Sequence, residues 1–249
     1  MYHFYTDKSN IGEGRITLTG EDVNHIKNVL RMKVGEELII CDKEGTDHFC
    51  RIADFDGGLV NAEIISSGDT KAELPTKLYL LQGMPKKDKM EMIIQKAVEL
   101  GVYEIVPVMT KRVIVKLDDD KKEAKKLERW QAIAEAAAKQ SGRGIIPKVH
   151  PVMSFKEVLK YAQDFDVNMI PYENADNSEL GMEHSRELIR SLKGRNAASI
   201  MIGPEGGFEE SEVAQAMEAG FSPISLGKRI LRTETAGMAA LAAIMFELD

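Results

Sequence analysis

The sequence predicts an α/β protein in which a small β-barrel precedes a larger α/β domain with a mainly parallel sheet. In residues 1–72, short apolar runs alternate with glycine-rich or acidic turns, which is the spacing of strands in a small barrel. After Pro75, strand-like and helix-like stretches alternate, as they do in domains built from βαβ units. We therefore divide the 249 residues into a first domain over residues 1–72 and a second over residues 73–249.

The first domain is expected to contain one helix among short strands. Residues 21–31 have the apolar spacing of a helix, with Thr19 or Gly20 as a cap. The polar residues 66–71 are typical of a linker. The expected strands cover residues 2–5, 15–18, 37–41, 48–55 and 59–65.

The second domain is expected to alternate strands with helices. Its expected strands cover residues 77–82, 104–109, 167–171, 199–202 and 223–226. Its expected helices cover residues 89–100, 123–140, 154–161, 185–192, 209–219 and 234–248. The last helix is apolar nearly all round, so it should be buried, and a subunit interface is one place where that can happen.

Composition excludes several classes of protein. No apolar run approaches the roughly 20 residues that span a bilayer, and the first residues lack the basic and apolar regions of a signal peptide. We therefore expect a cytoplasmic protein. Cys41 and Cys50 are expected to be buried, reduced thiols. The five histidines never stand at metal-ligand spacing, so we expect no metal site.

The formal net charge of -7 is unevenly distributed along the chain. Residues 1–72 hold 8 basic and 13 acidic residues (net -5), residues 85–148 hold 15 and 10 (net +5), and residues 149–249 hold 9 and 16 (net -7). The basic charge is therefore concentrated in the middle of the sequence, and the overall charge does not exclude a nucleic-acid partner.

Two glycine-containing turns stand out near the C-terminus. They are I-G-P-E-G-G-F-E-E, residues 202–210, and L-G-K-R-I-L-R-T-E-T-A, residues 226–236. Taken alone, the first is equally typical of a strand-to-helix turn without a ligand. A phosphate is disfavoured there because Glu209, Glu210 and Glu212 already offset the positive end of the following helix. No P-loop or G-x-G-x-x-G motif occurs in the chain.

A neutral or cationic ligand fits the two turns better, because glycines let the main chain approach a flat ring closely. Both turns follow predicted strands, so they should converge on one crevice at the carboxyl edge of the sheet. Ile230 and Leu231 would supply apolar walls, and Arg232 and Glu234 at the rim suggest chemistry there.

These residues resemble the bacterial 16S ribosomal RNA uridine-N3 methyltransferases, the RsmE family of the SPOUT (trefoil-knot) superfamily. The two C-terminal motifs carry most of the resemblance. Agreement extends over nearly the whole chain, through H-I-K-N-V-L-R-M-K-V-G (25–35), K-K-D-K-M-E-M (86–92), K-A-V-E-L-G (96–101), T-K-R-V (110–113) and E-A-A-A-K-Q-S-G-R (135–143) with Trp130.

The resemblance implies a PUA-like β-barrel, a knotted SPOUT α/β domain, a homodimer, and S-adenosylmethionine (AdoMet) as the methyl donor. The missing acidic G-x-G-x-G loop separately argues against a Rossmann-type methyltransferase. The resemblance places the adenosine of AdoMet against the main chain of both glycine turns and of residues 170–173. The implied AdoMet-binding residues are Ile170, Pro171, Ile202, Gly203, Pro204, Glu205, Gly206, Leu226, Gly227, Ile230, Leu231, Thr235 and Ala236.

Methylation at uridine N3 requires removal of a proton or stabilisation of the developing anion. We expect Arg232 to stabilise negative charge on the uracil carbonyl oxygens, the alternative being a surface ion pair. Glu234 is expected to act as a base or to orient Arg232, although a helix N-terminal carboxylate explains it equally well.

The substrate implied by the resemblance is a decoding-region uridine of 16S rRNA in the assembled small ribosomal subunit. We assign phosphate contacts to Lys111, Arg112 and Arg143 in the basic middle, and to Arg31 in the barrel. The lysine pairs at 121–122 and 125–126 are expected to form a solvated helix face. The barrel is acidic overall, so its expected contact with RNA requires a local basic face.

Three other functions remain open at this point. The chain could be a 2′-O-ribose methyltransferase of the same superfamily, or a non-enzymatic RNA-binding assembly factor, which the intact glycine turns disfavour. An unrelated α/β nucleotide hydrolase is disfavoured by the missing P-loop.

Overall fold

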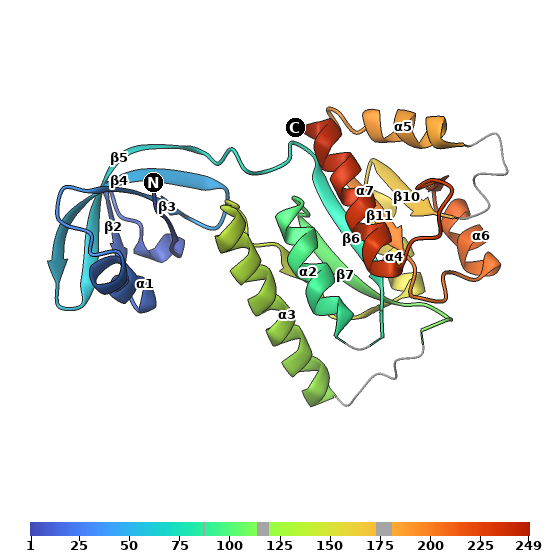
Figure 1. Cartoon of the computed structure of the whole chain (residues 1–249), viewed down its shortest axis with the longest axis horizontal. Coiled ribbons are helices and arrows are strands. Elements are labelled where there is room, and N and C mark those ends of the chain that lie inside the picture. Colours follow the sequence, from blue (N-terminus) through green and yellow to red (C-terminus); the bar gives the residue numbers. More distant parts are fainter. Residues whose placement is uncertain (87, 114–119, 173–180) are drawn as a thin grey trace. The chain divides into compact units, whose positions relative to one another are not determined.

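The chain forms two compact units (Figure 1). The computed structural model describes residues 1–86, 88–113, 120–172 and 181–249. The first unit comprises Met1–Glu73 and Ala138–Ile146, and the second comprises Leu74–Ala137 and Pro147–Asp249. The first unit thus ends next to the boundary expected at residue 72, but it also takes in a segment from the middle of the sequence. The division of function between two domains remains a prediction.

The first unit contains a five-stranded mixed sheet around its own apolar core. The strands lie in the order β1-β3-β4-β5-β2, with β1 parallel to β3 and the other pairs antiparallel. Inward-facing residues alternate along the strands, as in β3, where Leu38 and Ile40 are fully buried. The strands are β1 (His3–Tyr5), β2 (Arg15–Leu18), β3 (Glu37–Cys41), β4 (Thr46–Asp56) and β5 (Leu59–Asp69).

The helical part of the first unit is shorter and less regular than expected. After a 3-10 turn, η1 (Lys8–Asn10), and strand β2, it consists of α1 (Glu21–Asn24) followed by a π-helical turn, η2 (His25–Val29). Gly20 is the residue before α1, with a φ of 69°. Val23 and Ile26 are buried in the core, as the apolar spacing predicts.

The expected linker at residues 66–71 is largely wrong, because β5 continues to Asp69. Ser66 and Ser67 pair with β4 opposite Phe49 and His48, beyond a register shift in the ladder. Nδ1 of His48 and the hydroxyl of Ser67 are also hydrogen-bonded at 2.7 Å. Backbone pairing therefore orders a stretch whose composition is typical of a loop.

The second unit is built on a seven-stranded parallel sheet. Its strand order is β12-β10-β11-β6-β7-β8, with β9 also pairing with β7. The central strands are buried apolar runs, as expected for a sheet covered on both faces. The strands are β6 (Lys77–Gly83), β7 (Glu104–Met109), β8 (Lys148–Val149), β9 (Met153–Ser154), β10 (Val167–Pro171), β11 (Ala197–Ile202) and β12 (Phe221–Ile224).

The expected parallel sheet is confirmed, with two differences in detail. Strand β12 ends at Ile224, so Leu226 lies in the loop that follows it. Strands β8 and β9 have only two residues each, too few to show a period in the sequence.

Each helix expected in the second domain is present, with ends shifted by up to three residues. Helix α4 begins with a capping box in which Ser154 and Glu157 bond each other's backbone N–H groups. The helices are α2 (Lys89–Glu99), α3 (Asp120–Ser141), α4 (Phe155–Tyr161), α5 (Met182–Arg190), α6 (Glu210–Glu218) and α7 (Thr233–Leu248), with a 3-10 turn, η3 (Ala162–Asp164), after α4.

Helix α7 buries one face and exposes another. Ala240, Leu241 and Ile244 are buried against the second unit, whereas the side chain of Phe246 is 86% exposed. Helix α7 packs against α2, α5 and β11. The helix was expected to be buried, and within one chain it is buried only in part. None of the described helices has the length and apolar character needed to cross a bilayer.

Candidate active site

The two glycine turns lie at one edge of the parallel sheet. Strand β11 neighbours both β10 and β6, and β10 also neighbours β12. In register, Pro171 at the end of β10 stands beside Ile224 of β12, and Ile202 of β11 stands beside Gln82 of β6. Since parallel strands all end at the same edge, the loops that follow them share that edge, which is where open α/β sheets bind ligands.

The first turn depends on close contact between two main chains. A Cβ atom added at Gly83 would lie 2.7 Å from the backbone nitrogen of Pro204 and 2.9 Å from the carbonyl oxygen of Ile202. The N–H of Gly207 donates to the carbonyl of Pro204 at 2.9 Å, and Gly207 has a φ of 65°. The positive φ of Gly207 allows the turn, and the missing side chain of Gly83 lets the end of β6 lie against the backbone of Ile202 and Pro204.

A largely buried hydrogen-bond chain joins the first turn to the start of α7. The side-chain amide of Gln82 donates to the hydroxyl of Thr233 at 2.9 Å, and that hydroxyl donates to the carbonyl of Gly203 at 2.6 Å. Gln82 and Thr233 are both buried. Sequence reasoning missed this role of Thr233, because only the fold brings β6, β11 and α7 together. Thr235, which the resemblance assigned to AdoMet, is exposed in the first turn of α7, and Ala236 beside it is half-buried.

The start of α6 is already occupied by carboxylates. Glu209 and Glu212 form a capping box, with the N–H of Glu209 donating to Glu212 at 2.9 Å. The other oxygen of Glu212 accepts the backbone N–H of Lys111 at 2.8 Å, and Glu212 is buried. A phosphate at this helix end would meet two satisfied carboxylates, so the geometry supports a neutral or cationic ligand.

The second turn leaves main chain and apolar side chains accessible. Gly227 has a φ of 103°, and no atom of the described residues lies within 4 Å of the position of an added Cβ. Its N–H donates to the hydroxyl of Ser225 at 3.1 Å. Leu226 and Leu231 are half-buried, whereas Ile230 is 84% exposed and does not wall a pocket within this chain.

The loop after β10 approaches the second turn. Ile170 is buried and Pro171 is half-buried. The N–H of Tyr172 donates to the carbonyl of Ile224 at 3.1 Å, which continues the pairing of β10 with β12. Glu173, the last residue of the predicted loop, lies outside the described residues.

Lys89, which sequence reasoning missed, connects the two turns. Its ammonium group lies 3.1 Å from Glu205 in the first turn and 3.1 Å from Glu234 at the start of α7. The N–H of Lys86 also donates to Glu205 at 3.1 Å. Lys89 lies in the segment K-K-D-K-M-E-M (86–92) that contributes to the resemblance, but its role was missed because its partners lie more than a hundred residues away.

Backbone hydrogen bonds, together with the ion pairs to Lys89, favour the charged forms of these side chains. Burial alone would raise the pKa of Glu205, but hydrogen bonds from its own backbone, Lys89 and the Lys86 amide outweigh it and lower that pKa. A hydrogen bond from its own backbone, then Lys89 and the charge of Arg232, lower the pKa of Glu234. Hydrogen bonds to Glu205 and Glu234 raise the pKa of Lys89. Glu234 is therefore a weak base in this arrangement.

Arg232 lies at the exposed rim of the second turn. It is the residue before α7, and its carbonyl accepts the N–H of Ala236 at 2.8 Å. Within residues 1–86, 88–113, 120–172 and 181–249, no ion pair holds its guanidinium group. The alternative of a surface ion pair is thus not seen, and the guanidinium is accessible to a substrate.

Lys111 and Arg112 follow β7 and lie beside the first turn. Arg112 donates to the carbonyl of Gly206 at 2.8 Å, and a Cβ at Gly206 would lie 3.3 Å from that of Arg112. The ammonium of Lys111 contacts Glu209 at 3.1 Å and the hydroxyl of Ser211 at 2.9 Å. Both cations are exposed, but each also supports the turn, so replacing either would disturb more than RNA contact.

Arg143 does not fit its predicted role in phosphate binding. Its side chain is only 3% exposed and is paired with Glu73 through two hydrogen bonds of 2.9 and 2.5 Å. Its carbonyl accepts the hydroxyl of Tyr5 at 2.8 Å. Arg143 instead fastens Ala138–Ile146 within the first unit. Arg31 is exposed just after η2, with a φ of 54°, and is accessible to RNA.

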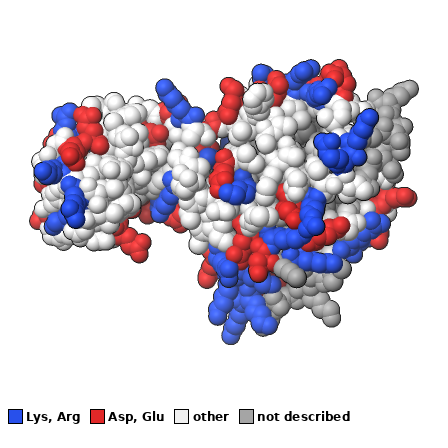
Figure 2. Space-filling view, viewed as in Figure 1, with Lys and Arg blue, Asp and Glu red and all other residues white. Residues whose placement is uncertain are grey.

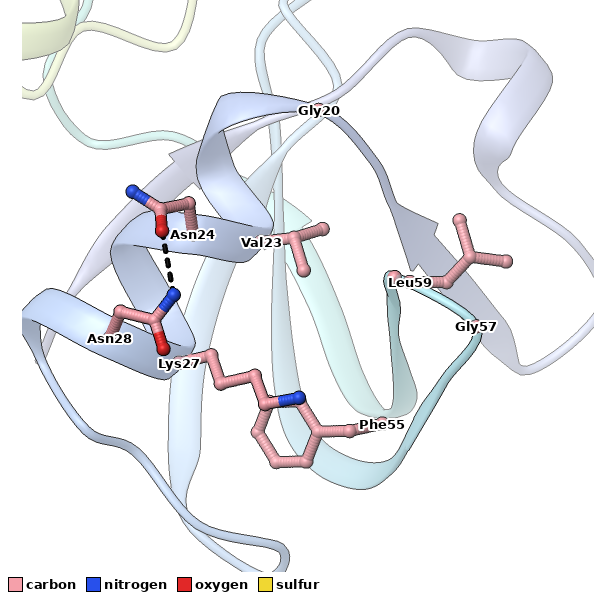
Figure 3. A pocket seen from close by; sticks show the side chains of 9 residues that line it. Gly20, Val23, Asn24, Lys27, Asn28, Phe55, Gly57 and Leu59 are labelled. Carbon is pink, nitrogen blue, oxygen red and sulfur yellow. Dashed lines mark hydrogen bonds between the residues drawn. The ribbon is translucent and has the colours of Figure 1, made fainter.

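The first unit also contains a pocket of about 300 Å³ between α1, η2 and the turn joining β4 to β5 (Figure 3). Its lining includes Lys27, Phe55 and the amides of Asn24 and Asn28, which bond each other at 2.7 Å. Gly57 and Gly58 close the turn. Among the residues that the structure describes, no carboxylate, histidine or cysteine lines it, so the pocket offers binding groups rather than a reactive centre.

One group of metal-ligand residue types occurs among the described residues: His3, Cys41 and Asp47. Hydrogen bonds already engage these side chains. His3 contacts Asp47 at 3.1 Å, and the thiol of Cys41 donates to the carbonyl of Gly144 at 3.1 Å. Burial raises the pKa of the Cys41 thiol to about 12, which disfavours the thiolate that a metal would need.

The chain matches two families of known proteins. Residues 72–245 match the family described as "RNA methyltransferase domain", and residues 18–65 match "RNA methyltransferase PUA domain". The second match covers all the residues that line the pocket of the first unit and agrees with the expected PUA-like barrel.

Curated relatives and a solved structure agree with these matches. The chain is 40% identical to ribosomal RNA small subunit methyltransferase E of Bacillus subtilis (strain 168), over 100% of this chain and 96% of the relative. It is 37% identical to the Mesomycoplasma hyopneumoniae (strain 232) protein of the same name, over 96% of each. The same enzyme from Neisseria gonorrhoeae, bound to S-adenosyl methionine, superposes with a TM-score of 0.81 at 36% identity, over 99% of this chain and 97% of that one.

The geometry and the comparisons point to the same conclusion. The site combines accessible main chain in two glycine turns with an exposed arginine at the carboxyl edge of a parallel sheet. The relatives match nearly the whole chain, including both turns. The chain therefore belongs to the ribosomal RNA small subunit methyltransferase E family.

Proposed function

We propose that this enzyme transfers a methyl group from AdoMet to N3 of a uridine in 16S rRNA of the small ribosomal subunit. The observation that carries the proposal is the meeting of the two glycine turns, with the accessible guanidinium of Arg232 at their rim. The names of the relatives specify ribosomal RNA of the small subunit, and the Neisseria gonorrhoeae structure holds S-adenosyl methionine. The reaction takes place in the cytoplasm.

The two turns suit the donor chemically. The carboxylates around α6 disfavour an anion, whereas the open space over Gly227 admits a ring against the main chain. AdoMet, when bound, supplies the methyl group on a positively charged sulfonium. The residues that would hold it are Ile170, Pro171, Ile202, Gly203, Pro204, Glu205, Gly206, Leu226, Gly227, Leu231, Thr235 and Ala236. Ile230 is left out of this set because its side chain is 84% exposed within one chain.

Arg232 supplies the catalytic charge. As the N3 proton leaves, negative charge spreads onto the uracil carbonyl oxygens, and a fixed guanidinium beside them stabilises it. A hydrogen bond from its own backbone, and then Lys89, lower the pKa of Glu234, so we assign Glu234 to positioning the start of α7 rather than to removing the proton.

Measurement of methyl transfer tests whether the substrate is the assembled small subunit or free 16S rRNA. We expect the enzyme to transfer labelled methyl groups from AdoMet to assembled small subunits lacking the modification, and much less to free 16S rRNA. Equal transfer to both would contradict recognition of the assembled particle, while leaving the reaction itself in place.

RNA contact is assigned to exposed cations on both units. Arg31 is the cation assigned to RNA contact in the first unit. Lys111 and Arg112 lie beside the site in the second unit. Figure 2 shows further Lys and Arg side chains gathered over the start of α3, where the lysine pairs at 121–122 and 125–126 are exposed. We retain these pairs as a solvated face.

Replacing Arg31 by glutamate should weaken RNA binding up to about tenfold and reduce its salt dependence, because one phosphate contact is lost. Titration of small-subunit RNA at several salt concentrations measures both effects, and AdoMet affinity should not change. Lys71→Glu, with the same charge change at an exposed position of the first unit, is the control. If both variants lost the same RNA affinity, the effect of Arg31→Glu would come from the change in net charge and not from a specific contact of Arg31 with RNA.

The exposed face of α7 supports a homodimer. Thr235, Ala239, Ala243 and Phe246 are exposed along one side of the helix, at spacings of four, four and three residues. Small residues there allow close packing of a second copy, with Phe246 as an apolar contact.

Phe246→Asp should shift the protein toward monomer, raising the dissociation constant of the dimer at least about tenfold through lost apolar burial. Light scattering over a range of protein concentrations measures this change. Ile65→Asp removes an exposed apolar side chain from the first unit and should leave the association unchanged. A Phe246→Asp protein that stays dimeric would place the interface elsewhere.

A further inference from the structure

The contacts of Lys89 link three segments that are distant in sequence. Lys89 is the first residue of α2, Glu205 is in the turn after β11, and Glu234 is in the first turn of α7. The ammonium group lies 3.1 Å from both carboxylates. All three side chains are less than a third exposed.

The charges explain why this cation matters to the site. Two carboxylates that share one ammonium at 3.1 Å would repel each other if the ammonium were absent. They stand on the two turns assigned to AdoMet, so repulsion would separate those turns. Arg232 is two residues before Glu234, and movement of Glu234 would carry Arg232 with it.

We propose that Lys89 is a positioning residue that holds the two glycine turns at the spacing needed to bind the methyl donor and to aim Arg232. The inference rests on the proposed function, since it concerns the same site. Lys89 acts through Glu205 and Glu234.

Lys89→Gln should lower AdoMet affinity by about ten- to 100-fold, which lies within the range of coupling between groups of one ion-pair network. It should also lower kcat, because a misplacement of about 1 Å can slow a reaction by up to about 100-fold. Lys89→Arg keeps the charge and should retain most of the affinity. In Lys89→Gln combined with Glu234→Gln, one of the repelling charges is removed, so donor affinity should recover relative to Lys89→Gln alone. If Lys89→Gln acted only by destabilising the fold, the second substitution would not restore donor affinity.

The test is calorimetric titration of AdoMet into each variant without RNA, followed by measurement of kcat and of KM for the donor. Lys96→Gln is the matched control, since Lys96 lies on the same helix and pairs with Glu99 at 2.8 Å. Thermal unfolding of each variant shows whether it is folded. Unchanged donor affinity in a folded Lys89→Gln protein, or no recovery in the double variant, would overturn the proposal.

Donor binding without RNA also separates this proposal from the proposed function. If the enzyme methylates another position, Lys89→Gln still loses donor affinity and the positioning role stands. If wild-type protein fails to bind AdoMet, the proposed function fails, and the positioning role fails with it.

Discussion

Replacing Arg232 by alanine should lower kcat by about 10²- to 10³-fold at saturating RNA and AdoMet, the range measured when one group that stabilises a developing oxyanion is removed. The guanidinium is exposed and has no ion-pair partner among the described residues, so its removal should cost little stability. The backbone bond from Ala236 to the Arg232 carbonyl does not need the side chain. Single-turnover measurement of methyl transfer isolates the chemical step.

Arg229→Ala is the control, because Arg229 is an exposed arginine in the same turn. It should leave kcat within a few-fold of the wild-type value. Donor affinity should remain similar in both variants. If Arg232→Ala turned over at the wild-type rate, Arg232 would not be the group that stabilises the negative charge on uracil.

Gly83→Ala should abolish AdoMet binding and destabilise the second unit. The added methyl group would meet backbone atoms of Pro204 and Ile202 at under 3 Å, and backbone cannot move aside as a flexible side chain can. Overpacking of this kind costs about 1–3 kcal/mol. A chain of this length loses about 2–4 °C in Tm for each kcal/mol. Calorimetry of unfolding and of AdoMet binding measures both effects.

Gly181→Ala is the matched control, since a Cβ there has no atom of the described residues within 4 Å and the backbone φ is -61°. It should bind AdoMet normally with little change in Tm. If Gly83→Ala also binds AdoMet normally, the close contact between β6 and the first turn does not shape the donor site.

The two glycine turns could be found from sequence because their information is local. Glycines after apolar runs predict turns at strand ends, and parallel strands bring such turns to one edge. The carboxylates of α6 likewise predicted the absence of a phosphate site, and their capping box now gives the physical basis.

Other features depend on contacts between distant residues. Lys89 meets partners more than a hundred residues away, and Gln82 reaches Thr233 across the sheet. Gly83 matters only because β11 lies beside β6. Local patterns do not show the partners of such residues, because the order of the strands decides which residues become neighbours.

The error over Arg143 has the same origin. Its position in a basic stretch favoured RNA contact, but Glu73 neutralises it inside the first unit. Residues 66–69 resembled a linker by composition, and their pairing with β4 orders them. Charge and composition describe what a segment can do when exposed, whereas tertiary contacts decide whether it is exposed.

The most direct test of the central claim is the identity of the methylated nucleoside. Small ribosomal subunits from a strain lacking this enzyme are incubated with the protein and isotope-labelled AdoMet, digested to nucleosides and analysed by mass spectrometry. We predict label in 3-methyluridine alone. Label on a ribose 2′-oxygen or on another base would contradict N3 specificity, and absence of label together with failure to bind AdoMet would contradict the enzymatic account itself.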